Sequence, residues 1–262
     1  MSLGIVIKGP EGIVLAADSR LTLVSQNIPV NFDNATKLFS FMEPNTTVGV
    51  VTYGEAIIGQ RNPRTAASLL PEFEYNLPKK KLSVSEFAKE FSKFFLDQWT
   101  TNMPKEHKGP GMTFVIGGYN TEEPYGRVYL VDIPNSPTPI EHHGGTGEFG
   151  ITYGGQNEIV ELLLKGYHPL MFETIKKTLT LTPIQEEQLK KIFENFKIGI
   201  PLNALALQDC VDLAISLIRT TMKVQGFAMG VRGVGGDIDV AVITRNRDIN
   251  FIQKKQIYGE TK

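Results

Sequence analysis

The chain opens with two short apolar runs on either side of a Gly-Pro turn, and this feature limits its possible folds most strongly. Residues 3–8 and 13–18 are rich in β-branched side chains, and Gly9, Pro10 and Gly12 separate them. This pattern predicts a β-hairpin. Neither run alternates with polar residues, as a strand with one solvated face would. We therefore expect the hairpin to lie inside a layered structure, not at a sheet edge.

The order of the remaining predicted elements argues against a doubly wound parallel sheet, because regular βαβ alternation is absent. Ser83 is predicted to open a further helix. We expect an α+β fold with two mostly antiparallel sheets packed together and helices outside, formed by residues 1–262 as one domain. The other predicted strands cover residues 36–42, 46–53, 112–117, 127–133, 140–143, 238–244 and 250–253. The other predicted helices cover residues 63–73, 157–164, 170–178, 183–196 and 203–224.

The helix that begins at Ser83 has the clearest sequence signals. Ser83 and Glu86 fit the capping-box pattern. An aromatic stripe at helical spacing follows, formed by Phe87, Phe91, Phe94, Phe95 and Trp99. Such a stripe could line a ligand cage, but we favour core packing because an amphipathic helix buries this kind of face.

Composition excludes several classes of partner and site. The 27 Lys and Arg residues nearly cancel the 28 Asp and Glu residues, so we expect no electrostatic binding to nucleic acid or to an anionic membrane. Cys210 is the single cysteine, which excludes an intramolecular disulfide and a thiolate zinc site and suits a reducing compartment, the cytoplasm. No run approaches the roughly 18 apolar residues that would span a bilayer.

Three motifs that could hold a ligand are interpreted as structural. Residues 230–236 are rich in glycine, but they follow a predicted helix and precede a strand, the reverse of a dinucleotide-binding loop. Residues 144–147 lack the Lys-Ser/Thr of a phosphate-binding loop. His142 and His143 are neighbours on a predicted strand and would point to opposite faces, so they are poor ligands for one metal. We expect neither a cofactor nor a metal.

The opening hairpin resembles that of proteasome-type β subunits, which are N-terminal-nucleophile hydrolases. Residues 12–20 resemble the family signature that ends in Ala-Ala-Asp-x-Arg. Residues 36–39, 114–119 and 235–244 resemble, in the same order, the family's Lys-Leu-Phe, Gly-Gly and closing strands. The match spans nearly the whole chain. It implies a four-layer αββα sandwich that assembles from identical subunits into a ring or stacked rings and cleaves peptides or unfolded proteins.

The resemblance also implies the catalytic residues. Counting back from Asp18 without gaps places the family's first residue, usually threonine, on Ser2, which loss of Met1 would expose. Alignment on Gly4 instead places it one position before Met1, which would leave the chain without a nucleophile.

Asp18 and Lys37 match the catalytic Asp and Lys of the family, and Gly54 matches the glycine whose N–H contributes to the oxyanion hole. In this family the α-amine of the first residue is the general base. An α-amine titrates near pH 8, so it can be partly neutral and activate a hydroxyl without a histidine.

Two functions of different classes remain open. The first is a peptidase of the threonine type with Ser2 as nucleophile and Asp18, Lys37 and Gly54 as its supporting residues. The second is an inert ring-forming scaffold, because the family's supporting Asp and Ser fall on Val231 and Val234, which carry no proton. A variant of the first keeps the fold but hydrolyses or transfers the amide of a small substrate.

Overall fold

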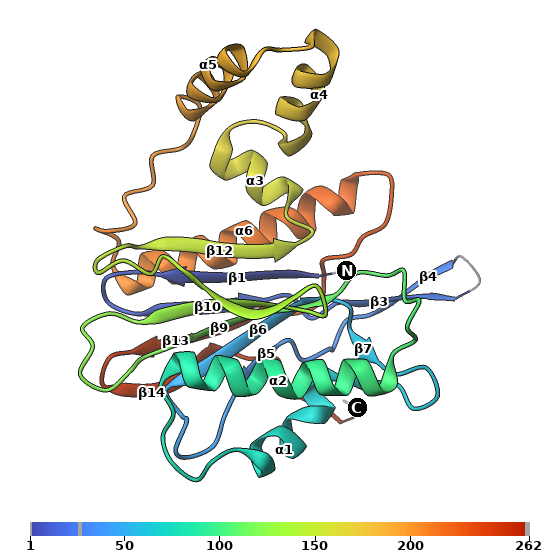
Figure 1. Cartoon of the computed structure of the whole chain (residues 1–262), viewed down its shortest axis with the longest axis vertical. Coiled ribbons are helices and arrows are strands. Elements are labelled where there is room, and N and C mark those ends of the chain that lie inside the picture. Colours follow the sequence, from blue (N-terminus) through green and yellow to red (C-terminus); the bar gives the residue numbers. More distant parts are fainter. Residues whose placement is uncertain (1, 26–27, 260–262) are drawn as a thin grey trace.

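Two five-stranded antiparallel sheets form the body of the computed structural model, which describes residues 2–25 and 28–259 (Figure 1). The first sheet has the order β12 (Gly150–Gly155), β1 (Leu3–Lys8), β2 (Ile13–Ala17), β13 (Asp239–Thr244) and β14 (Arg247–Gln253). The second has the order β11 (Ser136–His142), β10 (Arg127–Ile133), β9 (Met112–Gly118), β6 (Val48–Gly54) and β5 (Leu38–Ser40). Two small hairpins accompany them: β3 (Leu21–Ser25) with β4 (Ile28–Phe32), and β7 (Ile57–Ile58) with β8 (Arg64–Thr65).

The opening hairpin lies inside the first sheet, as predicted. β1 pairs with β12 and β2, and β2 pairs with β13, so neither strand is an edge. Every residue of both strands is buried. The period of two along a strand divides their side chains between two cores. Ile5 and Val14 face a helix, whereas Val6 and Leu15 face the second sheet.

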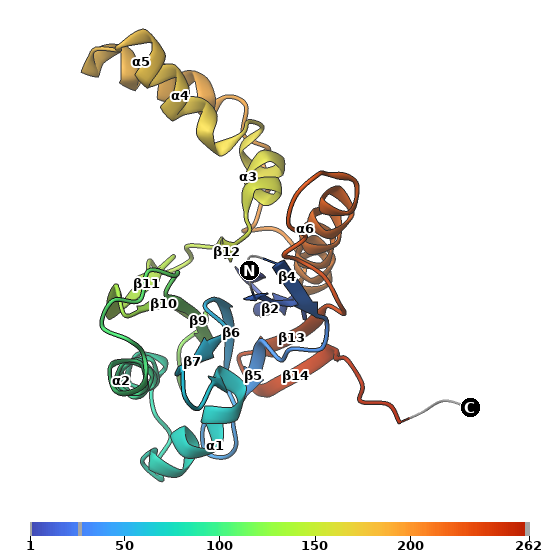
Figure 2. The ribbon, with the colours of Figure 1, turned by 90° about the vertical axis from the view of Figure 1, so that its right-hand side faces the viewer.

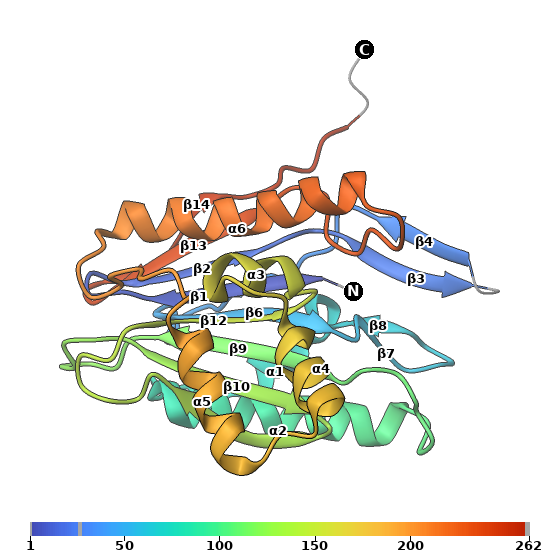
Figure 3. The ribbon, with the colours of Figure 1, turned by 90° about the horizontal axis from the view of Figure 1, so that it is seen from above.

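Two long helices cover the outer faces of the sheets (Figure 3). α6 (Leu207–Phe227) buries Cys210, Ala214 and Ile218 against β1 and β2, and Cys210 packs there as a free, buried side chain. α2 (Val84–Asn102) packs against β9, β10 and β11. Ser83 and Glu86 form the predicted capping box. The aromatic stripe is core: Phe91 contacts Phe73, Phe95 and Phe114 ring to ring.

Four shorter helices complete the described residues. α1 (Ala66–Asn76) joins the α2 core through Leu69 and Phe73. α3 (Glu158–Lys165) packs on α6. α4 (Pro169–Leu179) and α5 (Pro183–Glu194) project away from the sheets as a helical arm (Figure 2). Within the described ranges, no helix combines the length and apolar character needed to cross a membrane.

The structure corrects several predicted elements. β12 and the β3–β4 hairpin were not predicted at all. The sequence of β12, Gly-Ile-Thr-Tyr-Gly-Gly, carries a weak strand signal because glycine has no side chain to pack, and pairing with β1 supplies what local propensity lacks. The strand expected over 36–42 is limited to β5, and α6 begins at Leu207, four residues later than expected. β11 ends at His142, so His143, with a φ of 54°, lies outside the strand on which we placed it.

Candidate active site

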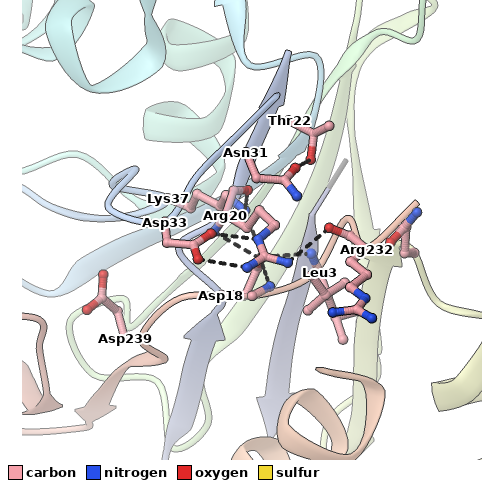
Figure 4. Close-up of polar contacts among 12 residues, drawn as sticks. Leu3, Asp18, Arg20, Thr22, Asn31, Asp33, Lys37, Arg232 and Asp239 are labelled. Carbon is pink, nitrogen blue, oxygen red and sulfur yellow. Dashed lines mark hydrogen bonds and ion pairs between the residues drawn. The ribbon is translucent and has the colours of Figure 1, made fainter. Parts of the chain in front are cut away.

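Asp18 lies at the centre of a polar cluster just after β2 (Figure 4). Its Oδ1 accepts hydrogen bonds from Lys37 Nζ at 2.7 Å and from the backbone N–H of Leu3 at 2.9 Å. Its Oδ2 accepts from the backbone N–H groups of Gly235 at 2.9 Å and Arg20 at 3.1 Å. The residue is 1% exposed. One buried carboxylate therefore joins the start of β1, the segment before β5 and the loop before β13.

Lys37 is buried beside this carboxylate and also donates to the carbonyl oxygen of Arg20. Burial lowers the pKa of Lys37 below its ordinary value, and the adjacent Asp18 carboxylate opposes that shift. A buried ammonium of this kind is a strong local positive charge, because little water screens it. It can stabilise negative charge that develops next to it.

Ser2 directly precedes Leu3, whose backbone N–H donates a hydrogen bond to Asp18. It is buried, and its carbonyl oxygen accepts a hydrogen bond from Gln156 N–H at 2.8 Å, which continues the β1–β12 pairing. Gly155 packs directly on this carbonyl: a Cβ there would lie 1.9 Å from Ser2 O, and its φ is +97°. Only glycine can hold this position. Met1, whose loss would expose the Ser2 amine, lies outside the described residues.

A cavity of about 270 Å³ brings the predicted residues together, since Ser2, Lys37 and Gly54 all line it. Asp18 does not line the cavity, but its carboxylate forms an ion pair with the ammonium of Lys37, which does. Gly54 ends β6 with a φ of +91°, and a Cβ there would lie 2.3 Å from Gly111 O, so no other residue fits without strain. The rest of the wall is largely apolar and includes Leu21, Ala35, Ala56, Ala66 and Met112.

Sequence reasoning missed a second layer of contacts around the cluster. Arg20 pairs with Asp33 through two hydrogen bonds, Nε to Oδ1 at 2.6 Å and Nη2 to Oδ2 at 2.7 Å, and also donates to Arg232 O at 3.1 Å. Gly235 and Gly236 let the loop before β13 approach: a Cβ would lie 2.3 Å from Arg20 Cζ at the first and 2.3 Å from Asp33 O at the second. Arg20 was part of the recognised signature, but no local pattern marks Asp33 as its partner.

The two valines contribute no polar side chain to the cluster. Val234 is buried against α6, and its N–H donates to Gln225 Oε1 at 3.0 Å. Val231 is half-exposed. The glycine-rich stretch that contains them connects α6 to β13, in the order predicted from the sequence. Nowhere in residues 2–25 and 28–259 do three His, Cys, Asp or Glu side chains group closely enough to hold a metal ion.

Comparison with solved structures identifies proteins with a similar fold. Neither a protein-family model nor a curated protein sequence matches the chain. Solved structures do match, among them a Gly-1 mutant of Anbu from Hyphomicrobium sp. strain MC1 and the helical assembly of the Anbu complex from Pseudomonas aeruginosa. The chain shares the Anbu fold.

The first match has a TM-score of 0.57 and 12% identity, and covers 100% of this chain and 89% of that one. The second has a TM-score of 0.57 and 14% identity, and covers 95% of this chain and 84% of that one. At these identities the likeness concerns the fold. It agrees with the mixed α and β architecture with antiparallel sheets that the sequence predicted.

Proposed function

We propose that the chain is a proteasome-type N-terminal-nucleophile peptidase that hydrolyses peptide bonds within a self-assembled ring. The observation that carries the proposal is the Asp18 carboxylate, which binds both Lys37 Nζ and the N–H that follows Ser2, beside a cavity lined by Ser2 and Gly54. The proposal includes the four-layer αββα arrangement, formed by residues 1–262 as one domain. We place the chain in the class of threonine-type endopeptidases, with serine in the position of the nucleophilic threonine.

The proposed reaction uses Ser2 as both nucleophile and base. The α-amine of Ser2 takes the hydroxyl proton while Oγ attacks the peptide carbonyl, and the proton then passes to the departing amine. The Lys37 ammonium, held by Asp18, stabilises the negative charge on the site, and the Gly54 N–H donates to the developing oxyanion. Water attacks the resulting acyl ester with the amine again as base, which restores the Ser2 hydroxyl and releases the acid. No metal or organic cofactor takes part.

The mechanism needs Ser2 to be the first residue of the mature chain. Its amine must be free, because an amide nitrogen is not a base at the working pH. Ser2 is small and buried, and it lines the cavity. In the proposed reaction the substrate carbonyl approaches Ser2 from this cavity. Loss of Met1 supplies the free amine.

We propose identical subunits as partners, in a ring or stacked rings, and peptides or unfolded proteins as substrates, with no nucleic acid or membrane partner and a cytoplasmic location. The Anbu complex of P. aeruginosa forms a helical assembly, which supports self-association of a chain with this fold. The arm formed by α4 and α5 exposes large apolar side chains, among them Leu170, Leu179, Ile184 and Ile192. Contacts between copies would cover such residues.

A peptide library in which the residue before the cleaved bond varies tests this function. The assay compares protein whose N-terminus is Ser2 with the Ser2→Ala variant. We expect cleavage that the substitution abolishes. No cleavage of any member by the wild type, or equal cleavage by Ser2→Ala, contradicts the proposal.

The second candidate function is the inert scaffold, which the apolar side chains of Val231 and Val234 favour. In that case the Asp18–Lys37 pair links β1, β2 and the loop before β13 and takes no part in catalysis. Assembly into rings with no cleavage by the wild type supports this alternative. Cleavage that depends on Ser2 excludes it.

A further inference from the structure

The phenol ring of Tyr53 occupies a slot made by two glycines of the first sheet. Gly4 of β1 and Gly154 of β12 are opposite each other in the antiparallel register. A Cβ on Gly4 would lie 3.0 Å from Tyr53 Cδ1, and one on Gly154 would lie 2.2 Å from Cζ and 2.4 Å from the hydroxyl oxygen. The ring therefore lies against bare backbone on both strands. A larger residue at Gly154 would displace the ring, and one at Gly4 would first clash with Val51 Cγ1 at 2.5 Å.

This slot places Tyr53 in the wall of the cavity that the candidate nucleophile also lines. The oxygen lies over Gly154, and the next residue, Gly155, packs on the carbonyl of Ser2. Side chains alternate along a strand, so Ser2 and Gly4 face the same side of the sheet, the side on which Tyr53 packs. Tyr53 and Ser2 line the same cavity, together with Gly54.

The hydroxyl is available as a hydrogen-bond donor. It makes no hydrogen bond to another residue of the described ranges, and the Tyr53 side chain is only partly buried. Burial raises the pKa of Tyr53 to about 12. The group thus keeps its proton over the whole range in which an α-amine titrates, near pH 8.

We propose that Tyr53 is a further catalytic residue of the site, whose hydroxyl donates a hydrogen bond to the carbonyl oxygen of the bound peptide as that oxygen becomes negative. The inference rests on the proposed function. It gives the site a second donor beside the Gly54 N–H, on the adjacent residue. It also supplies a polar side chain from β6, in a site where Val231 and Val234 offer none. The glycines at positions 4 and 154 then serve to hold this donor rigidly.

Tyr53→Phe is the decisive substitution, because it keeps the ring in its slot and removes only the hydroxyl. We expect kcat/KM for a cleaved library peptide to fall about a hundredfold to a thousandfold, with the loss in kcat and not in KM, as removal of an oxyanion donor does. The melting temperature should stay near that of the wild type. Tyr119→Phe is the matched control, since Tyr119 is buried in the same core between the sheets but does not line the cavity.

Each outcome separates this inference from the proposed function. Wild-type cleavage that depends on Ser2, with unchanged kcat in Tyr53→Phe, overturns the role of Tyr53 and leaves the function standing. An equal loss in Tyr119→Phe also overturns it, because the effect would then come from core packing. No cleavage by the wild type contradicts the function and, with it, this inference. Gly154→Ala is a second test, because its Cβ should displace the Tyr53 ring and so lower kcat as well.

Discussion

Substitution of Asp18 by asparagine should destabilise the protein more than any other single polar change at the site. The carboxylate is almost fully buried and accepts four hydrogen bonds, one of them from the Lys37 ammonium. Asparagine removes the charge and turns one acceptor into a donor, which leaves the buried ammonium without its counter-ion. Breaking a buried ion pair from one side costs about 3–5 kcal/mol. We expect a decrease of that size in the free energy of unfolding.

Lys37→Met should cost less, about 1.5–3 kcal/mol, because Asp18 keeps its three backbone N–H donors. The double variant should cost less than the sum of the two single changes by at least about 1 kcal/mol, since the second substitution removes a group that the first has already left unpaired. Urea unfolding of all four proteins at neutral pH measures the cycle. Asp33→Asn is the control, because its pair with Arg20 is partly exposed and worth about 0–1 kcal/mol. An Asp18→Asn cost below about 1 kcal/mol, or an additive cycle, refutes this reasoning.

Three further predictions follow from the same structure. Gly155→Ala forces a Cβ onto the Ser2 carbonyl at a φ of +97°, so cleavage should be lost and the free energy of unfolding should fall by at least about 1–3 kcal/mol in urea. Burial lowers the pKa of Lys37, so the unfolded chain binds the Lys37 proton more tightly than the folded chain does. The free energy of unfolding of the wild type, measured relative to Lys37→Met, should therefore rise with pH up to 10.5, the ordinary pKa of lysine. A fall over this range would contradict the lowered pKa. Phe91→Ala in the aromatic core should cost about 3–5 kcal/mol by urea unfolding, whereas Tyr75→Ala at an exposed position of α1 should change stability by about 0.5 kcal/mol or less.

The parts of the fold that could be predicted are those with a strong local signal. The apolar runs before and after Gly9 identify an interior hairpin, and the Ser83–Glu86 pair with its aromatic stripe identifies α2 and the face it buries. β12 could not be predicted, because its glycines give no strand propensity and its reason for being a strand is the β1 backbone beside it. Local patterns cannot report such a partner when the paired residues of the two strands are at least 142 positions apart along the chain, as Lys8 and Gly150 are.

The candidate site divides in the same way. Ser2, Asp18, Lys37 and Gly54 were found through resemblance to a family, and the structure places three of them around one cavity with Asp18 behind. The groups that complete the cluster come from elsewhere in the sequence: the Gly235 N–H that binds Asp18 lies 217 residues away. Nothing in the sequence near Asp18 specifies that contact. Only the closure of the loop before β13 against the β2 end of the first sheet creates it.

The mass of the mature chain after reaction with an electrophilic peptide that bonds both a hydroxyl and an α-amine tests the central claim most directly. Such a reagent modifies a residue only when its hydroxyl and its free amine lie together. The account predicts a chain without Met1 that carries one adduct, and peptide mapping should locate the adduct on Ser2. A chain whose Ser2 amine is free but that stays unmodified, or an adduct at another residue, contradicts the claim that Ser2 is the nucleophile.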